Sequence, residues 1–134
     1  MIKKVEHIGI AVKDLDKGEE LYAKLLGRKS YKREEVESEN VITSFFDAKT
    51  KIELLASTIE DGVIAKFIDK KGEGIHHIAF EVEDIEAEME RLKEEGFILL
   101  NEKPKKGADN KMVCFVHPKS CNGVLIELCM EIKE

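Results

Sequence analysis

The stretch that decides the fold is Ile75-His76-His77-Ile78-Ala79-Phe80-Glu81-Val82-Glu83-Asp84-Ile85. It repeats an earlier stretch, Val5-Glu6-His7-Ile8-Gly9-Ile10-Ala11-Val12-Lys13-Asp14-Leu15, and in both copies an Asp comes seven residues after the repeated His. A second pair of similar stretches closes the two halves of the chain: Lys51-Ile52-Glu53-Leu54-Leu55 and Leu125-Ile126-Glu127-Leu128-Cys129. Each half therefore begins on a strand that carries a histidine and ends on a strand that carries a glutamate.

Apolar residues alternate along these four stretches, which is typical of strands with one face in a hydrophobic core. Ile8, Ile10 and Val12 share one face in the first stretch, so His7 lies on the other face with small residues beside it. The same alternation turns the other repeated polar residues away from the helix-covered face. The candidate ligands of one shared site are His7, Glu53, His77 and Glu127.

After each strand that carries a histidine, apolar residues recur at the spacing of a helix. Asp14 or Asp16 can cap the first helix, and Glu19 stands where a capping box beginning at Asp16 needs it. Gly27 ends this helix. Its predicted buried residues are Leu15, Leu21, Tyr22, Leu25 and Leu26. A second helix begins after Asp84 and ends at Gly96, and residues 58–72 form a connecting helix. The remaining strands are predicted near 31–36, 41–46, 52–56, 97–100, 112–117 and 124–130.

These elements predict an α+β fold of two strand-helix-strand-strand-strand modules within a single domain, residues 1–134. Module one covers about 1–57, the linking helix about 58–72, and module two about 73–134. Two such modules make a curved, eight-stranded mixed sheet with its helices on the outer face. The concave face then holds a metal-binding pocket.

Composition excludes several classes of protein. The 134 residues are 43% hydrophobic and 37% charged, and no apolar run reaches the ~20 residues that a membrane helix needs. A net charge of −6 argues against nucleic acid or an anionic membrane as partner. We expect a cytoplasmic protein, because no signal region precedes the first strand and the cysteines, Cys114, Cys121 and Cys129, are odd in number.

Paired modules with His on the opening strand and Glu on the closing strand resemble the glyoxalase/bleomycin-resistance/dioxygenase superfamily, the vicinal oxygen chelate proteins. The resemblance covers the whole chain. Segments 7–12, 64–67, 72–80, 117–120 and 123–128 are similar to those of the methylmalonyl-CoA epimerases. The resemblance implies an acyl-CoA substrate, with interconversion of (R)- and (S)-methylmalonyl-CoA, and a homodimer.

The resemblance also implies one divalent metal ion per chain, cobalt before nickel, manganese or zinc, held by residues matching His7, Glu53, His77 and Glu127. Two imidazoles and two carboxylates suit such ions. The residue matching Glu127 is implied to be a base as well as a ligand. A second glutamate base of the family matches Thr43, which has no useful basicity. Water, His76 or Glu53 is left as the second base.

Other residues are candidates for substrate binding. His117, Lys119 and Ser120 form a loop that we expect to line the substrate channel, although a turn explains them equally well. Lys103, Lys105, Lys106 and Lys111 make the neighbouring segment basic, so it can meet CoA phosphates or simply be a solvated turn.

Two other functions are compatible with the sequence. Glyoxalase I, the lactoylglutathione lyase, has the same kind of metal site, and the superfamily also contains non-catalytic binding modules. The binding modules generally lack the metal ligands. An extradiol dioxygenase is disfavoured, because its iron site uses two His and one carboxylate and its chain is usually longer.

Overall fold

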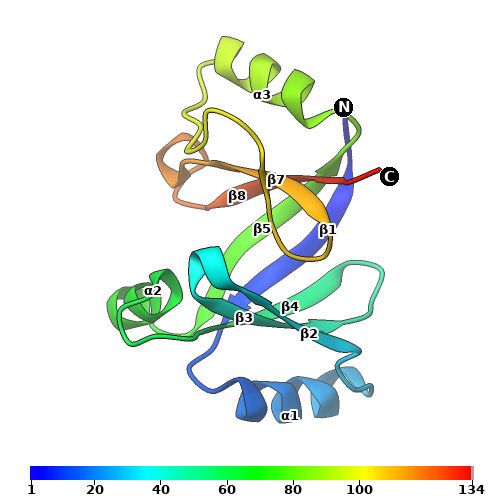
Figure 1. Cartoon of the computed structure of the whole chain (residues 1–134), viewed down its shortest axis with the longest axis vertical. Helices are drawn as coiled ribbons and strands as arrows, with labels where there is room; N and C mark the ends of the chain where they lie inside the picture. The colour runs from blue at the N-terminus through cyan, green and yellow to red at the C-terminus, as the bar shows by residue number, and fades with distance from the viewer. Residues whose placement is uncertain (134) are drawn as a thin grey trace. The chain divides into compact units, whose positions relative to one another are not determined.

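The computed structural model describes residues 1–133, which form eight strands, three α-helices and two short 3₁₀ turns (Figure 1). In chain order these are β1 (Ile2–Ala11), α1 (Leu15–Leu26), β2 (Lys32–Val36), a 3₁₀ turn (Glu37–Glu39), β3 (Val41–Phe46), β4 (Lys51–Ser57), α2 (Val63–Lys71), β5 (Gly74–Val82), α3 (Ile85–Glu94), β6 (Lys105–Lys106), β7 (Lys111–Val116), a second 3₁₀ turn (Pro118–Ser120) and β8 (Ile126–Glu131). The predicted α+β class and the repeated strand-helix-strand-strand-strand order are confirmed.

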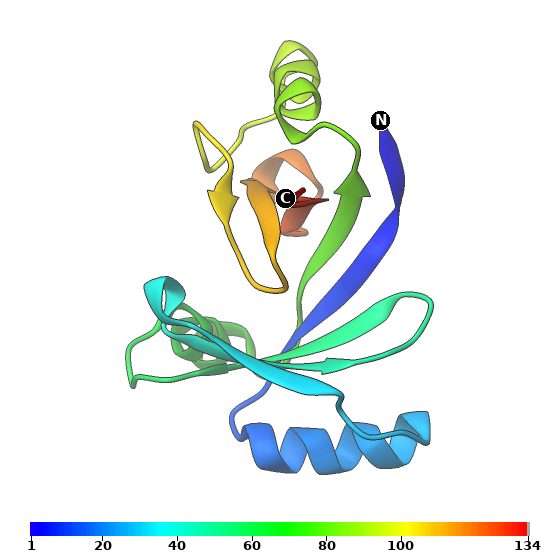
Figure 2. The ribbon, with the colours of Figure 1, turned by 45° about the vertical axis from the view of Figure 1, so that its right-hand side comes forward.

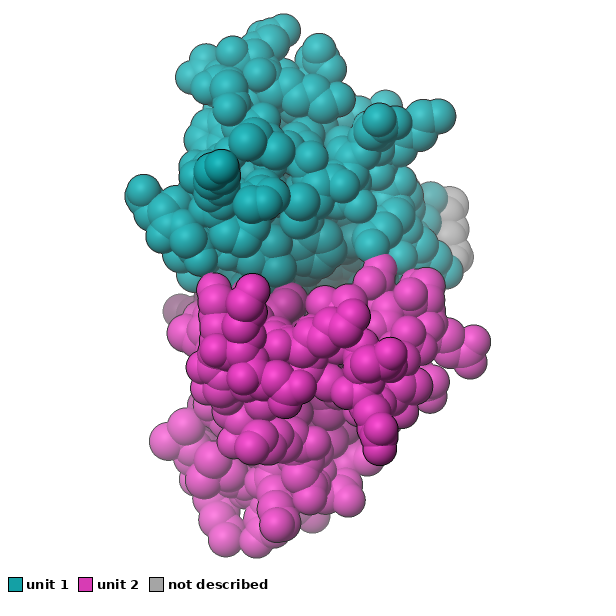
Figure 3. Space-filling view, turned by 90° about the vertical axis from the view of Figure 1, so that its left-hand side faces the viewer, with its two compact units in different colours: residues 1–7, 77–134 teal, residues 8–76 magenta. Residues whose placement is uncertain are grey.

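The chain folds into two compact units, coloured separately in Figure 3. Unit 1 contains residues 1–7 and the chain from His77 onward, and unit 2 contains residues 8–76. Strands β1 and β5 contribute residues to both units. The boundaries fall directly after His7 and directly before His77, so both histidines belong to unit 1. The assignment of residues 1–134 to a single domain, with modules at 1–57 and 73–134, stays a prediction.

Unit 2 contains strands in the order β2-β3-β4-β1, and α1 packs on one face of this sheet. Leu15 of α1 joins Val12, Phe46 and Leu54 in this core. The predicted stripe of α1 is wrong at Leu21 and Leu25, which are 62% and 71% exposed. The buried stripe passes through Gly18 instead, since a Cβ there would lie 3.3 Å from both Val12 and Leu54. A glycine lets the helix approach the strands closely, and hydrophobicity alone does not reveal it.

The start of α1 is set by Asp14, whose side chain accepts a hydrogen bond from the Lys17 amide at 3.1 Å. The predicted capping box of Asp16 and Glu19 is wrong. Both carboxylates instead bind the guanidinium of Arg33 in β2, with Glu19 at 2.8 Å from Arg33 Nε. Asp16 and Glu19 therefore bind Arg33 of β2 and not the backbone amides at the start of α1.

The connecting helix α2 packs on the opposite face of the unit 2 sheet. Its Ile64 and Ile68 contact the cluster that contains Ala11 and Leu55. Leu55 shares its strand face with Glu53, so this face is partly covered by a helix within unit 2. The expectation that the glutamate faces carry no helix is wrong for this part of the chain.

Unit 1 contains strands in the order β1-β5-β8-β7-β6, with β5 and β8 parallel and β7 antiparallel to β8 and β6. Helix α3 packs on this sheet (Figures 1 and 2). Its Ile85 and Met89 are 1% and 3% exposed and contact Val82 and Leu128 in one core. Asp84 caps α3 as predicted, accepting from the Ala87 amide at 3.1 Å.

The predicted strand at residues 97–100 is wrong. This segment makes only an isolated bridge between Leu99 and Val116. The side chain of Asn101 then takes the place of a backbone partner, accepting from the Phe115 amide at 2.8 Å. Pairing with β7 resumes at the two-residue strand β6. The apolar residues at 97–100 would suit a longer strand paired with β7, but the side chain of Asn101 occupies the hydrogen-bonding position that such a strand would use.

Candidate metal centre

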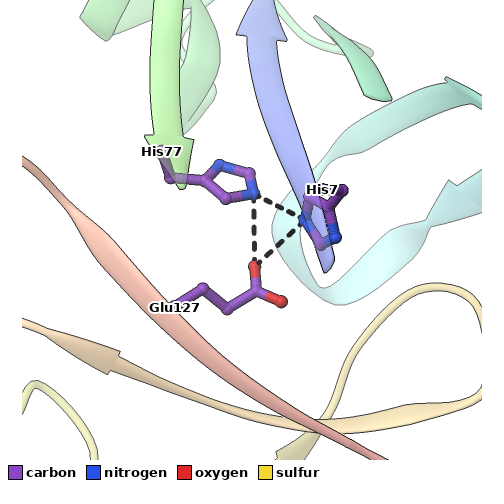
Figure 4. Close-up of side chains that lie close together, drawn as sticks. All are labelled: His7, His77 and Glu127. Carbon is purple, nitrogen blue, oxygen red and sulfur yellow. Dashed lines mark hydrogen bonds and ion pairs between the residues drawn. The ribbon is translucent and has the colours of Figure 1, made fainter. Parts of the chain in front are cut away.

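Three of the four predicted ligands meet in unit 1, each from a different strand. His7 is near the middle of β1, His77 in β5 and Glu127 in β8 (Figure 4). The Nε2 atoms of His7 and His77 are 3.0 Å apart. Glu127 Oε1 lies 3.2 Å from His77 Nε2 and 3.8 Å from His7 Nε2. The three donor atoms can therefore share one ion.

Strand pairing explains why His77 and Glu127 meet. In the parallel pair of β5 and β8, Ala79 is the partner of Glu127. His77 is two residues before Ala79, so all three side chains lie on the same face. Ala79 is fully buried, and its small side chain leaves room beside the two ligands. The face predicted from sequence alternation is thus confirmed for His77 and Glu127.

The cluster is shielded from water. His7, His77 and Glu127 are 5%, 4% and 6% exposed. The Phe115 ring stands edge-on to His77, with ring centroids 6.1 Å apart. Buried imidazole and carboxylate groups need a partner or a metal, because desolvation otherwise disfavours them.

The sequence prediction missed Glu6, which is 4% exposed. Its Oε1 lies 2.7 Å from Nδ1 of His7. If the Glu6 carboxylate is ionised it can only accept hydrogen bonds, and Nδ1 of His7 is then the donor of this one. The Nε2 lone pair of a neutral His7 then faces His77 and Glu127. The one signal in the sequence is that Glu6 directly precedes a candidate ligand.

The donor set fits a divalent cation. At metal–ligand bonds of about 2.0–2.2 Å, neighbouring donors lie roughly 2.8–3.6 Å apart. Two of the three distances observed, 3.0 Å and 3.2 Å, fall in this range, and the third is 3.8 Å. Ring nitrogens and a carboxylate oxygen at such distances repel one another unless a proton or a cation lies among them. Two nitrogens and one oxygen suit a transition-metal ion better than calcium.

Two further site residues lie in unit 2. Glu53 is 5% exposed on β4 and pairs in register with Phe45. Thr43 is 1% exposed and its hydroxyl donates to the carbonyl of Glu34 at 2.9 Å. The hydroxyl of Thr43 thus makes a hydrogen bond between strands β3 and β2. The assignment of Glu53 as the fourth ligand stays a prediction.

The predicted substrate-binding loop is ordered by its own side chains. His117 Nδ1 accepts from the Lys119 amide at 2.9 Å and so caps the 3₁₀ turn. Ser120 Oγ accepts from the Ile98 amide at 2.9 Å. These contacts give His117 and Ser120 a structural role, and only Lys119 is exposed. Their contact with substrate stays a prediction.

The basic segment before this loop divides into two groups. Lys103 and Lys106 are exposed, and Lys105 places its ammonium 5.9 Å from the centre of the Phe115 ring. Lys111 is only 4% exposed and lies 3.8 Å from both Asp109 and Glu131. The expectation that Lys111 meets CoA phosphates is therefore wrong, because its charge is buried and already partnered.

All three cysteines are free thiols. Burial raises the pKa of Cys114 and Cys129, and the charges of Glu127 and Glu6 raise the pKa of Cys129 further. These two thiols stay protonated at neutral pH and are poor nucleophiles.

None of the helices within residues 1–133 is long and apolar enough to cross a membrane.

Comparison with known proteins finds relatives that align with almost the whole chain. The chain is 43% identical to the ethylmalonyl-CoA/methylmalonyl-CoA epimerase of Cereibacter sphaeroides over 131 residues, which is 96% of this chain and 98% of that protein. The methylmalonyl-CoA epimerase of Mycobacterium tuberculosis superposes with a TM-score of 0.93 at 36% identity, covering 98% of this chain and 90% of that one. A methylmalonyl-CoA epimerase in complex with methylmalonyl-CoA and NH4⁺ superposes with a TM-score of 0.91 at 33% identity, covering 98% and 96%.

The family model of the Glyoxalase/Bleomycin resistance protein/Dioxygenase superfamily matches residues 6–115, most of the chain. This match begins at the residue before His7 and includes His77. With the relatives above it confirms the resemblance found in the sequence: the chain belongs to the glyoxalase/bleomycin resistance protein/dioxygenase superfamily.

Proposed function

We propose that this protein is a metal-dependent isomerase, a methylmalonyl-CoA epimerase that interconverts the (R) and (S) forms of its substrate. The observation that carries the proposal is the buried cluster of His7, His77 and Glu127. Relatives named as methylmalonyl-CoA epimerases align over almost the whole chain, and one solved relative holds methylmalonyl-CoA itself.

The reaction needs a base and a way to stabilise negative charge. The proton leaves the carbon between the carboxylate and the thioester, and its bonding electrons move to the thioester oxygen as an enolate forms. A bound divalent cation would supply a Lewis acid for the developing negative charge. His7 and His77 supply neutral nitrogen donors that hold such an ion, and Glu127 supplies a negatively charged oxygen.

Glu127 is our proposed base. Its Oε1 lies 3.2 Å from His77 Nε2 and 3.8 Å from His7 Nε2, which leaves its second oxygen to accept the α-proton of a substrate bound beside the cluster. Exclusion of water from this buried site favours proton return to the same carbon. Return to the opposite face inverts the centre.

The second acid–base group, which exchanges a proton with the opposite face of the carbon, is Glu53, His76 or water. His76 packs edge-on against Phe67 with ring centroids 4.8 Å apart, which supports a structural role for it. Glu53 is a buried carboxylate and has the more suitable chemistry.

We propose that the exposed lysines Lys103, Lys106 and Lys119 bind the CoA phosphates. His117 and Ser120, which order the loop, line the substrate channel beside Lys119. Lys103→Gln/Lys106→Gln should raise KM for methylmalonyl-CoA several-fold. It should also make KM less dependent on salt, because salt screens the attraction between exposed lysines and phosphates. Lys70 on α2 is also exposed, so Lys70→Gln is the matched control and should leave KM unchanged. An unchanged KM in the double variant would remove the phosphate role.

One assay decides the function. Metal-loaded protein in deuterated water should place deuterium at the α-carbon of methylmalonyl-CoA and equilibrate its two forms. The glutathione hemithioacetal of methylglyoxal, tested in parallel, should give no lactoylglutathione. Turnover of the hemithioacetal alone would identify a glyoxalase I. Binding of either compound without exchange would identify a non-catalytic binding module.

The composition of the unit 1 cluster matches one other kind of metal site, which an experiment can separate from the proposed one. Two histidines and one carboxylate also form the facial triad of non-haem iron oxygenases. Oxygen uptake with Fe²⁺ and a catechol tests this alternative. We expect none, because Glu53 as a fourth ligand would leave fewer open positions.

The remaining details of our proposal are cobalt as the resident metal, a homodimer and a cytoplasmic location. Three free thiols accord with a reducing compartment. Elemental analysis of protein purified without added metal tests the cobalt assignment, and analytical ultracentrifugation tests the dimer.

A further inference from the structure

We propose that Glu6 is a positioning residue that fixes His7 in the one tautomer able to bind metal through Nε2. The inference rests on the proposed metal-dependent function and concerns how this chain prepares the site. The supporting contact is the 2.7 Å hydrogen bond between Nδ1 of His7 and Oε1 of Glu6.

The geometry makes the two nitrogens of His7 unequal. Nδ1 meets the Glu6 carboxylate, and Nε2 is 3.0 Å from His77 Nε2 and 3.8 Å from Glu127 Oε1. A neutral imidazole carries one proton and one lone pair. With the proton held at Nδ1, the lone pair must face the other two donors, so His7 is ready to bind before an ion arrives.

Burial makes this contact effective. The side chains of His7 and Glu6 are 7% and 4% exposed, so water competes little for either of them. A charge-assisted hydrogen bond is stronger than a neutral one, and it also fixes the plane of the ring. A carboxylate on the far nitrogen raises the basicity of the metal-binding nitrogen as well.

The second copy of the repeat shows that the fold does not require a carboxylate here. Val5-Glu6-His7 corresponds to Ile75-His76-His77, so His76 occupies the position of Glu6. His76 packs its ring against Phe67 at a centroid distance of 4.8 Å. Both copies form the same kind of strand, so the role of Glu6 is specific to His7.

The first test uses metal-free protein and requires no substrate. Long-range ¹H–¹⁵N correlation spectra distinguish a protonated ring nitrogen from an unprotonated one. In the parent protein His7 should be protonated at Nδ1 only, whereas Glu6→Ala should show a mixture of tautomers. Glu6→Gln keeps the size and one acceptor oxygen, so it should retain the Nδ1–H tautomer. A single Nδ1–H tautomer in Glu6→Ala would overturn the proposal.

The second test measures Co²⁺ binding by titration and by its visible absorption. Glu6→Ala should weaken affinity about 10- to 100-fold and change the absorption bands, with a smaller loss in Glu6→Gln. Glu81→Gln is the matched control, since Glu81 is a carboxylate of the same unit that pairs with Lys3 at 3.4 Å. It should bind Co²⁺ as the parent does.

Circular dichroism establishes which variants are folded. Parental Co²⁺ affinity and spectrum in Glu6→Ala would overturn the positioning role, and if Glu6→Ala does not fold, parental affinity and spectrum in Glu6→Gln would overturn it. These outcomes are separate from the proposed activity. A parent protein that binds Co²⁺ but does not epimerise methylmalonyl-CoA would overturn only the proposed function.

Discussion

Glu127 is a buried carboxylate that lies beside two imidazole rings. It is 6% exposed, and its Oε1 lies within 3.8 Å of two ring nitrogens. A divalent cation held by those nitrogens would also bind this oxygen. The free oxygen can then act as a base on a substrate bound at the same ion.

Replacing Glu127 by Gln tests the base role directly. The amide keeps the size of the side chain and one oxygen donor but cannot accept the α-proton. We expect turnover of methylmalonyl-CoA to fall by about 10²–10⁴-fold, the usual contribution of a general base. Metal affinity should fall much less.

Deuterium exchange at saturating Co²⁺ separates the two effects. If exchange stays at the parental rate in Glu127→Gln while the ion is bound, another residue removes the proton.

Among the elements, α1 shows how a helix can present leucines to solvent and still be held firmly. Leu15 is 8% exposed within the core of unit 2, whereas Leu25 in the last two turns is 71% exposed. Burial of Leu15, together with the close approach at Gly18, fixes the side of α1 that faces the sheet.

Two substitutions on α1 should therefore lower the free energy of unfolding by different amounts. Leu15→Ala should lower the free energy of unfolding by about 2–5 kcal/mol, because it leaves a cavity between α1 and its sheet. Leu25→Ala should change it by less than about 0.5 kcal/mol. Urea denaturation followed by circular dichroism gives both values. Equal losses would mean that Leu25 is covered in solution.

Helix α3 is tied to the start of β1 by an ionic contact. Glu88 of α3 accepts from the N-terminal ammonium of Met1 at 3.0 Å and from Arg91 at 3.0 Å. The hydrogen bonds from Arg91 and from the terminal ammonium lower the pKa of Glu88 below its ordinary value of 4.5. A lowered carboxylate pKa in the folded state stabilises the fold above the unfolded value and loses that effect as pH falls through the folded value.

Glu88→Gln should therefore reduce the acid sensitivity of the protein. Its melting temperature should be lower than that of the parent at pH 7, and the difference should shrink as pH falls from about 4.5 through the lower pKa of Glu88. Thermal melts between pH 3 and pH 7 measure this. A constant difference across the range would contradict an ionic role for Glu88.

The two halves of the chain repeat one another, and this duplication carries most of the structural information in the sequence. Matched His and Glu positions in the two halves predicted the element order, the strand faces and the cluster of His7, His77 and Glu127. Tertiary contacts decided the rest. Asn101 interrupts a predicted strand. Arg33 binds the carboxylates of Asp16 and Glu19, which were expected to cap α1. Such contacts join residues that are distant in sequence, so no local pattern contains them.

The cluster also predicts that metal binding stabilises the protein as a whole. His7 lies near the start of the chain and Glu127 near its end, and the unfolded chain does not bring them together. Co²⁺ at about 100 times its dissociation constant should add ~2.7 kcal/mol, which raises the melting temperature by roughly 5–10 °C. Chelator should reverse the shift, and His77→Ala should abolish it. A smaller shift in Glu53→Ala than in the parent would support Glu53 as the fourth ligand, whereas equal shifts would contradict that assignment.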